Sequence, residues 1–161
     1  MKILVTGSSG FLASNVIYKL INKKKTFIYG VDKNKNKFLK NKKNFKEFIM
    51  DLSKEKNVDK LFKLLKNKID IVFHSSAVQP IKKDEDFKKY LDGNFISTKN
   101  ILEACRTNNI KKIVFSSSFS VYGKQKNPIT EKHKLEPTNF YGLSKKLAEK
   151  ILEYYSRVYN F

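Results

Sequence analysis

The sequence predicts an α/β fold with a doubly wound parallel sheet of about five strands. Short apolar runs alternate with amphipathic stretches along the chain, and the runs contain few polar residues. Continuous apolar runs are typical of parallel strands that are buried on both faces. The chain has 161 residues, of which 40% are hydrophobic, and this suffices for one sizeable core. We therefore expect residues 1–161 to form a single domain.

The first half of the chain contains four predicted strands and two predicted helices. The strands are expected at residues 2–6, 26–31, 45–50 and 69–73. One helix is expected at 10–22, where apolar residues recur at helical spacing, and another after Ser53, which can act as its N-cap. Residues 33–44 are polar and basic, and they predict a loop between two strands.

The second half contains a long helical stretch, a fifth strand and a final helix. The helical pattern covers 86–108, and the strand is expected at 112–116. Residues 119–137 contain two prolines and predict a loop. The final helix is expected to open at Thr138 and to run nearly to residue 161. No repeat or linker divides the chain.

The chain carries a formal net charge of +19, from 34 lysines and arginines against 15 acidic residues. Such a balance can indicate a nucleic-acid-binding or anion-binding surface. Arg106 and Arg157 are the only arginines, however, whereas nucleic-acid-binding proteins normally use arginine for bidentate contacts. Because the lysines are spread along the whole chain, we favour a solvated surface over a nucleic-acid site.

The composition also excludes other classes of protein. Cys105 is the only cysteine, which rules out a disulfide framework and a cysteine-based zinc site, and its apolar surroundings place it in the core. His74 and His133 are isolated, so no metal site is predicted. No apolar run is long enough to span a membrane. The chain opens with a strand rather than a secretory leader, so we expect a cytoplasmic protein.

The predicted strand at 2–6 is followed by the segment TGSSGFLA, which leads into a helix. Gly7 permits the tight turn from strand to helix, and Gly10 lets a pyrophosphate approach the backbone. The helix N-terminus adds free N–H groups and a partial positive charge. Ala13 stands where a third glycine is more usual, and it still allows close packing. The segment predicts dinucleotide binding, and the alternative is a plain structural turn.

Acidic residues follow the next two predicted strands. Asp32 can accept hydrogen bonds from ribose hydroxyls and would repel a 2′-phosphate, which favours NAD over NADP. The lysines directly after it can offset part of that repulsion, and a simple turn residue is the alternative. Asp51 can accept the adenine amino group while Leu52 covers the ring, although Asp51 can equally cap a helix.

Small residues follow the predicted strand at 69–73 and leave room for a bound dinucleotide. They are Ser75, Ser76 and Ala77. His74, just before them, is predicted to be a packed, hydrogen-bonded strand residue rather than a catalyst. Asn94 lies in the long helix and can hold the turn after the strand at 112–116. Structural and functional roles both remain open for Asn94.

Tyr141 and Lys145 lie four residues apart in the final predicted helix, which places them on one helical face. The Lys145 ammonium can then stabilise the tyrosinate, so that Tyr141 acts as a general base. A hydroxyl after the strand at 112–116 can orient the substrate oxygen. The same spacing arises by chance in a lysine-rich chain, and an exposed helical tyrosine is the alternative.

Four segments in this order resemble the extended short-chain dehydrogenase/reductase family, in its NAD-dependent nucleotide-sugar epimerase/dehydratase branch. They are TGSSGFLA, VFHSSA, IVFSSSFSVYG and EPTNFYGLSKKLAE, and together they span essentially the whole chain. Ala13 and Ser76 are departures from the family pattern. The resemblance implies a Rossmann-like fold, NAD as cofactor, Tyr141 as catalytic base, Lys145 as its supporting ammonium and Ser118 as the active-site hydroxyl.

The residues above and this resemblance together give a predicted cofactor-binding set. It comprises Gly7, Gly10, Phe11, Leu12, Asp32, Asp51, Leu52, Ser75, Ser76, Ala77, Asn94, Tyr141 and Lys145.

The resemblance also implies a reaction on a nucleotide-sugar, with a UDP-hexose as the expected substrate. Tyr141 would take a proton from a sugar hydroxyl while hydride passes to NAD, and a 4-epimerase returns hydride to the other face of the transient ketone. Similar 4,6-dehydratases carry an acid pair directly before VYG, and similar decarboxylases carry a glutamate there. This chain has Phe119 and Ser120. Epimerisation or simple oxidoreduction therefore remains, with a non-catalytic dinucleotide-binding module as the alternative.

Similar full-length enzymes continue for about as many residues again, which fits two domains. Their second half supplies the last strands and the substrate lobe, so this chain resembles a truncated cofactor half. A fragment, a degenerate product and one chain of a split enzyme all stay open, and we expect NAD binding with little turnover. The resemblance also implies a homodimer through the long helix and the Tyr141 helix. The final helix has two apolar stripes, Leu147/Ile151/Tyr154/Val158 and Ala148/Leu152/Tyr155/Tyr159.

Overall fold

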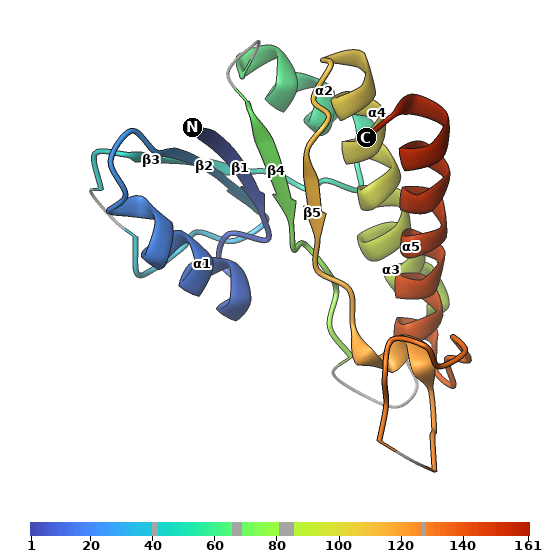
Figure 1. Ribbon diagram of the computed structural model, residues 1–161. Coiled ribbons are helices and arrows are strands. Elements are labelled where there is room, and N and C mark those ends of the chain that lie inside the picture. The colour runs from blue at the N-terminus through green and yellow to red at the C-terminus, as the bar shows by residue number, and fades with distance from the viewer. Residues whose placement is uncertain (40–41, 66–68, 81–85, 127) are drawn as a thin grey trace.

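The computed structural model describes residues 1–39, 42–65, 69–80, 86–126 and 128–161. Within these ranges, five parallel strands form one sheet in the order β3-β2-β1-β4-β5 (Figure 1). The strands are β1 (Lys2–Thr6), β2 (Phe27–Asp32), β3 (Phe45–Ile49), β4 (Ile71–His74) and β5 (Ile113–Phe115). This order and the parallel pairing confirm the predicted doubly wound, Rossmann-like fold.

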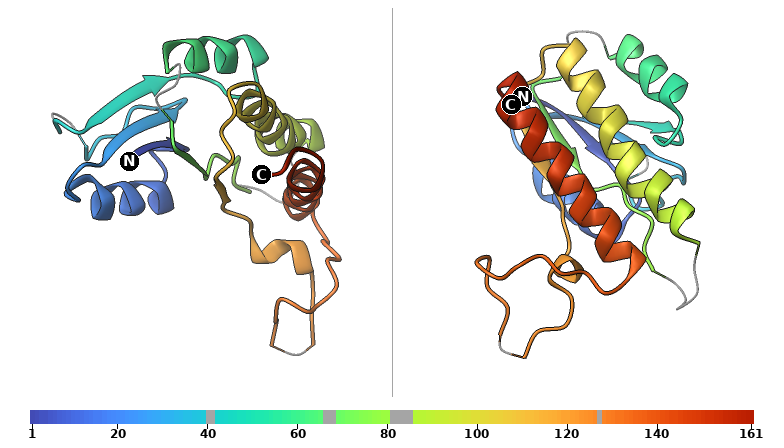
Figure 2. Two further views of the ribbon diagram at one scale, coloured as in Figure 1. Left: turned by 45° about the horizontal axis from the view of Figure 1, so that its top comes forward. Right: turned by 90° about the vertical axis from the view of Figure 1, so that its right-hand side faces the viewer.

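Helices cover both faces of the sheet, and α4 and α5 run side by side (Figure 2). The helices are α1 (Phe11–Ile21), α2 (Glu55–Leu64), α3 (Phe87–Tyr90), α4 (Ser97–Thr107) and α5 (Phe140–Tyr159). Helix α1 lies on one face, whereas α2 and α4 lie on the other. The predicted loop at 33–44 has no regular structure in its described part, and its residues 40–41 lie outside the described residues.

The central strand β1 is buried on both faces because successive side chains alternate across it. Leu4 packs in a cluster with residues of α2 and α4, including Leu61 and Ile101. Its neighbours Ile3 and Val5 pack on the opposite face, against α1. All three are at most 4% exposed. Burial on both faces explains why the sequence run is continuously apolar, and it fixes the strand ends that carry the site.

The structure confirms the long helical stretch predicted at 86–108, but one segment of it is not α-helical. The six residues Leu91–Ile96 form a π-helical segment between α3 and α4. A Cβ atom on Gly93 would lie 2.3 Å from a Val78 methyl carbon, so the chain after β4 packs directly on the backbone here. Such wide turns commonly mark functional positions in helices. The periodicity therefore placed the helical stretch correctly but did not reveal its π-helical turns.

Two predicted helix starts are also shifted. Ser53 does not cap α2, because its hydroxyl donates to the carboxylate of Asp51 at 2.7 Å, and Lys54 stands at the N-cap. The final helix begins after Asn139 rather than Thr138, and the Asn139 side chain accepts a hydrogen bond from the Gly142 N–H at 2.7 Å. Asparagine caps well because its short side chain reaches the free N–H groups of the first turn.

Strand β5 forms one edge of the sheet and pairs only with β4 in the described part of the chain. Its central residue Val114 is 49% exposed, which leaves apolar surface at that edge. Among the described residues, no helix is long and apolar enough to cross a membrane.

Candidate functional site

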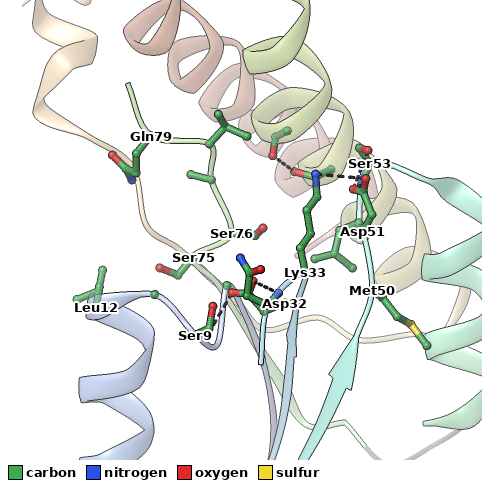
Figure 3. A pocket seen from close by; sticks show the side chains of 18 of the residues that line it. Ser9, Leu12, Asp32, Lys33, Met50, Asp51, Ser53, Ser75, Ser76 and Gln79 are labelled. Carbon is green, nitrogen blue, oxygen red and sulfur yellow. Dashed lines mark hydrogen bonds and ion pairs between the residues drawn. The ribbon is translucent and has the colours of Figure 1, made fainter. Parts of the chain in front are cut away.

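A cleft of about 630 Å³ opens beyond the carboxyl ends of β1, β2, β3 and β4 (Figure 3). Ligands of doubly wound sheets bind at this edge, where the strand order reverses. Ten of the predicted cofactor-binding residues line the cleft. They are Gly7, Gly10, Phe11, Leu12, Asp32, Asp51, Leu52, Ser75, Ser76 and Ala77.

The turn after β1 is built around two glycines. Gly7 has a φ of +68°, and a Cβ atom there would lie 2.9 Å from the backbone of Ser75. Glycine is therefore required by both its conformation and its close approach to the neighbouring strand end. Gly10 is the N-cap of α1 and offers no side chain to its first N–H groups. The turn thus presents main-chain donors to the cleft, which suits an anionic ligand.

Asp32 ends β2 and faces the turn after β1. One carboxylate oxygen accepts from the Ser9 N–H at 3.1 Å, and the other accepts from the Asn34 N–H at 2.9 Å. Figure 3 shows this carboxylate beside Ser9 at the base of the cleft. The two backbone donors hold the acid in place, with negative charge at the predicted ribose position.

Asp51 follows β3 on the far side of the cleft. Its carboxylate accepts two hydrogen bonds from Ser53, at 2.9 Å and 2.7 Å, and pairs with the Lys33 ammonium at 3.2 Å. Burial acts to raise the pKa of Asp51, but the Ser53 hydrogen bonds and Lys33 outweigh it and hold that pKa below its usual range. Lys33 therefore reaches across from the end of β2 toward β3 (Figure 3).

The segment after β4 is tied to β1 through a buried threonine. The Thr6 hydroxyl oxygen accepts from the N–H groups of Ser75 and Ser76, both at 3.1 Å. Thr6 is fully buried, so the contact is shielded from water. This arrangement fixes the path of the chain where the small residues line the cleft.

His74 is a packed residue, as predicted. It is 1% exposed, with Nδ1 at 2.6 Å from the Thr6 hydroxyl and Nε2 at 3.0 Å from the Thr98 hydroxyl. Burial, and secondarily the charge of Lys145, lower the pKa of His74 to about 3. Cys105 is fully buried as well, and burial raises the pKa of its thiol to about 12, in keeping with its predicted place in the core.

Asn94 lies in the π-helical segment and does not line the cleft. Its Oδ1 accepts from the Val78 N–H at 2.6 Å, and its Nδ2 donates to the Ser144 hydroxyl at 2.8 Å. The Ser144 hydroxyl in turn donates to the Tyr141 carbonyl at 2.7 Å. The predicted contact with the turn after β5 is therefore wrong, because the side chain joins the segment after β4 to α5.

Tyr141 and Lys145 lie on the buried face of α5, at 7% and 1% exposure. The Lys145 ammonium donates to the Ser116 carbonyl at 2.7 Å. Burial lowers the pKa of Lys145 to about 8, although the Glu149 carboxylate opposes the shift. The exposed-tyrosine alternative is excluded by this burial.

Ser118 follows β5 and caps a short 3₁₀ helix, Phe119–Tyr122. Its hydroxyl oxygen accepts from the Ser120 N–H at 3.2 Å. Like Tyr141 and Lys145, Ser118 lies outside the lining of the cleft. The predicted site thus divides into a cleft beyond β1 to β4 and a second group of side chains at the end of β5 and on α5.

A model of the NAD dependent epimerase/dehydratase family matches residues 3–161. The chain belongs to this family. A UDP-glucose 4-epimerase of Pisum sativum is 33% identical and aligns with 93% of this chain and 46% of its own length. A putative UDP-glucose 4-epimerase of Methanocaldococcus jannaschii is 35% identical and aligns with 98% of this chain and 52% of its own length. The chain spans about half the length of the curated relatives it matches.

Solved structures of epimerases share the fold of this family member. The UDP-glucuronic acid 4-epimerase of Bacillus cereus, in complex with UDP-glucuronic acid and NAD, matches with a TM-score of 0.88 and 26% identity. That match covers 100% of this chain and 54% of the other. The UDP-glucose 4-epimerase of Thermotoga maritima, with UDP-glucose, matches with a TM-score of 0.88 and 29% identity, over 100% of this chain and 53% of the other.

One residue with a clear place in the cleft architecture was missed by sequence reasoning. Asn36 is 3% exposed, and its Nδ2 donates to the Ser8 carbonyl at 2.7 Å. Its Oδ1 accepts from the N–H groups of Phe38 and Leu39. It lies in a run of alternating lysine and asparagine, where composition hides it. A useful signal would have been its place four residues after Asp32.

Proposed function

We propose that this chain is the NAD-binding part of a nucleotide-sugar 4-epimerase. The proposal rests on one observation, that the structure holds both a cleft suited to a dinucleotide and a separate buried tyrosine–lysine pair. A cleft with main-chain donors and an acid at its base lies beyond β1 to β4, and a buried tyrosine–lysine pair lies on α5. Epimerases of known structure share this fold, one in complex with UDP-glucuronic acid and NAD and another with UDP-glucose. Residues 1–161 would then act as one cofactor-binding domain.

The residues of the cleft fit a dinucleotide. Gly7 and Gly10 leave the backbone accessible at the N-terminus of α1, where a pyrophosphate gains from free N–H groups and the helix dipole. Asp32 would accept hydrogen bonds from the adenosine ribose and would repel a 2′-phosphate. Lys33 does not offset that repulsion fully, because its ammonium is already paired with Asp51. We therefore propose NAD rather than NADP.

The chemistry would rest on three side chains of the second group. Tyr141 would take the proton of a sugar hydroxyl, and the Lys145 ammonium would favour its phenolate form. Ser118 would hold the reacting oxygen by a hydrogen bond. Bound NAD would supply the hydride acceptor for the sugar carbon that bears this hydroxyl and, in its reduced form, the hydride donor. Phe119 and Ser120 offer no carboxylate for dehydration, so a 4-epimerase acting on a UDP-hexose is the proposed activity.

Calorimetric titration with NAD and NADP tests the cofactor proposal. We expect NAD to bind at least about tenfold more tightly than NADP, with the preference reduced in Asp32→Asn. Equal affinity for the two dinucleotides would refute the role of Asp32. Lys150→Met, an exposed change on α5, serves as the control because Lys150 does not line the cleft.

The alternative is a dinucleotide-binding module without catalysis. Tyr141→Phe separates the two functions when NAD affinity and conversion of UDP-glucose are both measured. An epimerase predicts measurable, slow conversion in the parent chain, and its loss in Tyr141→Phe with NAD affinity kept. No conversion in either protein, with NAD bound by both, would favour the binding module.

We also propose that the chain forms a homodimer through α4 and α5. Of the two apolar stripes on α5, Ala148 and Tyr155 are buried, whereas Tyr154 and Val158 are each 48% exposed. Light scattering after size exclusion should give a dimer, and Val158→Lys should give a monomer. A parent chain that is monomeric at high concentration would remove the proposal, and a matched Val114→Lys variant would reveal association through the sheet edge instead.

A further inference from the structure

The Lys145 ammonium lies over the face of an aromatic ring. Its Nζ is 4.0 Å from the ring centroid of Phe115, the last residue of β5. The same atom donates to the Ser116 carbonyl at 2.7 Å. Lys145 is 1% exposed, so little water remains to solvate the charge. Attraction between a cation and a ring face is strongest under such desolvation.

The Phe115 ring also packs against a second ring. The imidazole of His74 stacks on it with centroids 5.8 Å apart and an interplanar angle of 26°. Strand pairing sets this contact, because β4 and β5 align His74 with Phe115 in register. The ring of Phe115 therefore contacts both a buried ammonium and a buried imidazole.

Hydrogen bonds hold His74 in one neutral tautomer. The Thr6 oxygen already accepts from two backbone N–H groups, so its own proton points to Nδ1 of His74. Nε2 then carries the hydrogen and donates to the Thr98 hydroxyl, which donates onward to the Asn94 carbonyl at 2.5 Å. A neutral imidazole adds no second positive charge beside Lys145.

We propose that Phe115 is a positioning residue, whose ring face holds the Lys145 ammonium at the end of β5, one helical turn from Tyr141. The inference deepens the proposed function and rests on it for its link to catalysis. Phe115 touches neither substrate nor cofactor in this role. It acts through Lys145, and the neutral His74 ring fixes its orientation.

The charged and titratable groups around the ammonium are few in the described part of the chain. Glu149 lies one turn further along α5, Tyr141 one turn back, and His74 beside Phe115 on β4. Glu149 favours the charged form of Lys145 from a distance, while burial opposes it. The ring face and the Ser116 carbonyl are thus the direct contacts that favour the ammonium.

Carbon-13 labelling at lysine Cε gives a direct readout on the whole chain. Protons of Lys145 close to the face of Phe115 should be shifted upfield by the ring current, and their signal should be absent in Lys145→Met. This signal should titrate near the Lys145 pKa of about 8. In Phe115→Leu we expect the upfield shift to vanish and the titration midpoint to fall by about one pH unit. Phe115→Tyr should keep both the upfield shift and the titration midpoint.

Fluorinated phenylalanines at position 115 provide a second test in case Phe115→Leu does not fold. Fluorination weakens the negative face of the ring and preserves its shape, so the titration midpoint should fall stepwise from phenylalanine to mono-, di- and trifluoro derivatives. A midpoint that is constant across this series would overturn the proposal. Phe38, whose side chain is 83% exposed in the loop after β2, provides a control position for the same series.

NAD affinity measured on the same samples separates this inference from the proposed function. Loss of the ring-shifted signal in Phe115→Leu, with no NAD binding even in the parent chain, would refute the proposed function and leave the Phe115–Lys145 contact established. NAD binding with an unshifted Lys145 signal in the parent chain would refute the Phe115–Lys145 contact and leave the proposed function standing.

Discussion

The side-chain amide of Asn36 donates to the main-chain carbonyl of Ser8 at 2.7 Å, and so ties the loop after β2 to the turn after β1. The same amide nitrogen lies 3.0 Å from the Ser14 hydroxyl on α1. The Asn36 N–H donates to the carboxylate of Glu47 on β3 at 2.9 Å. One buried residue therefore joins the turn after β1, helix α1 and strand β3.

We predict that Asn36→Ala destabilises the fold by about 1–3 kcal/mol, because it leaves buried backbone groups without partners. NAD affinity should fall as well, since Asp32 is positioned by the same loop. Urea unfolding and calorimetry measure the two effects. Asn15→Ala, at an exposed site on α1, is the matched control and should change neither. Unchanged stability in Asn36→Ala would show that the loop holds its path by other contacts.

Acid should destabilise the protein through His74. The folded pKa is about 3, below the usual value of about 6.5, so the unfolded chain binds more protons between these limits. The free energy of unfolding should therefore fall as pH falls from about 6.5, at a rate approaching about 1.4 kcal/mol per pH unit. Urea unfolding at several pH values checks this. Asparagine does not titrate in this pH range, so the dependence of the free energy of unfolding on pH should be weaker in His74→Asn by up to about 1.4 kcal/mol per pH unit. Parallel slopes would contradict a neutral, buried His74.

Two glycines of the same turn should respond differently to alanine. Gly7→Ala should cost about 2 kcal/mol or more, because it requires φ of +68° and a Cβ 2.9 Å from the Ser75 backbone. Gly10→Ala should cost less than about 1 kcal/mol, because φ is −73° and the nearest atom to a Cβ is 3.2 Å away. Both should weaken NAD binding. Thermal unfolding compares them, and equal destabilisation would count against the geometry of the turn.

Removing the buried charge of Lys145 should stabilise the fold while it removes function. The folded pKa of about 8 lies below the usual value of about 10.4, so the cost of burying the charge is full below pH 8 and disappears toward pH 10. Lys145→Met should then raise the free energy of unfolding at pH 7 by about 1–3 kcal/mol. Lys150→Met should leave it within about 0.5 kcal/mol. A destabilised Lys145→Met would mean that the contacts of the ammonium outweigh its burial.

Most of the fold was predictable because it depends on local pattern. Continuous apolar runs gave the strands, and parallel sheets collect their ligand-binding residues at the strand ends. The prediction of the cleft residues after β1 to β4, from Gly7 to Ala77, follows from that rule together with the family resemblance. Strand ends differ from prediction by one or two residues, as at β4, because hydrogen bonding rather than apolarity ends a strand.

Contacts between distant segments were not predictable. In the π-helical segment, Gly93 packs against Val78, and the side chain of Asn94 donates a hydrogen bond to Ser144. Asn94 and Ser144 are 50 residues apart in the sequence. The Lys33–Asp51 ion pair joins two strand ends whose order no local pattern fixes. The partners of Lys145 follow from how α5 lies on β5, which helical spacing does not specify.

The position of β1 at the centre of the sheet has a consequence for synthesis on the ribosome. Ile3 pairs with Ile28 on one side, but its other partner is Ile71, far along the chain. Strand β1 leaves the exit tunnel well before β4, so it keeps one edge open until β4 has been translated, and β5 can add only after that. Contacts this distant in sequence slow folding. The nascent chain should therefore depend on chaperones during that interval, and a translational pause after β4 should raise its yield.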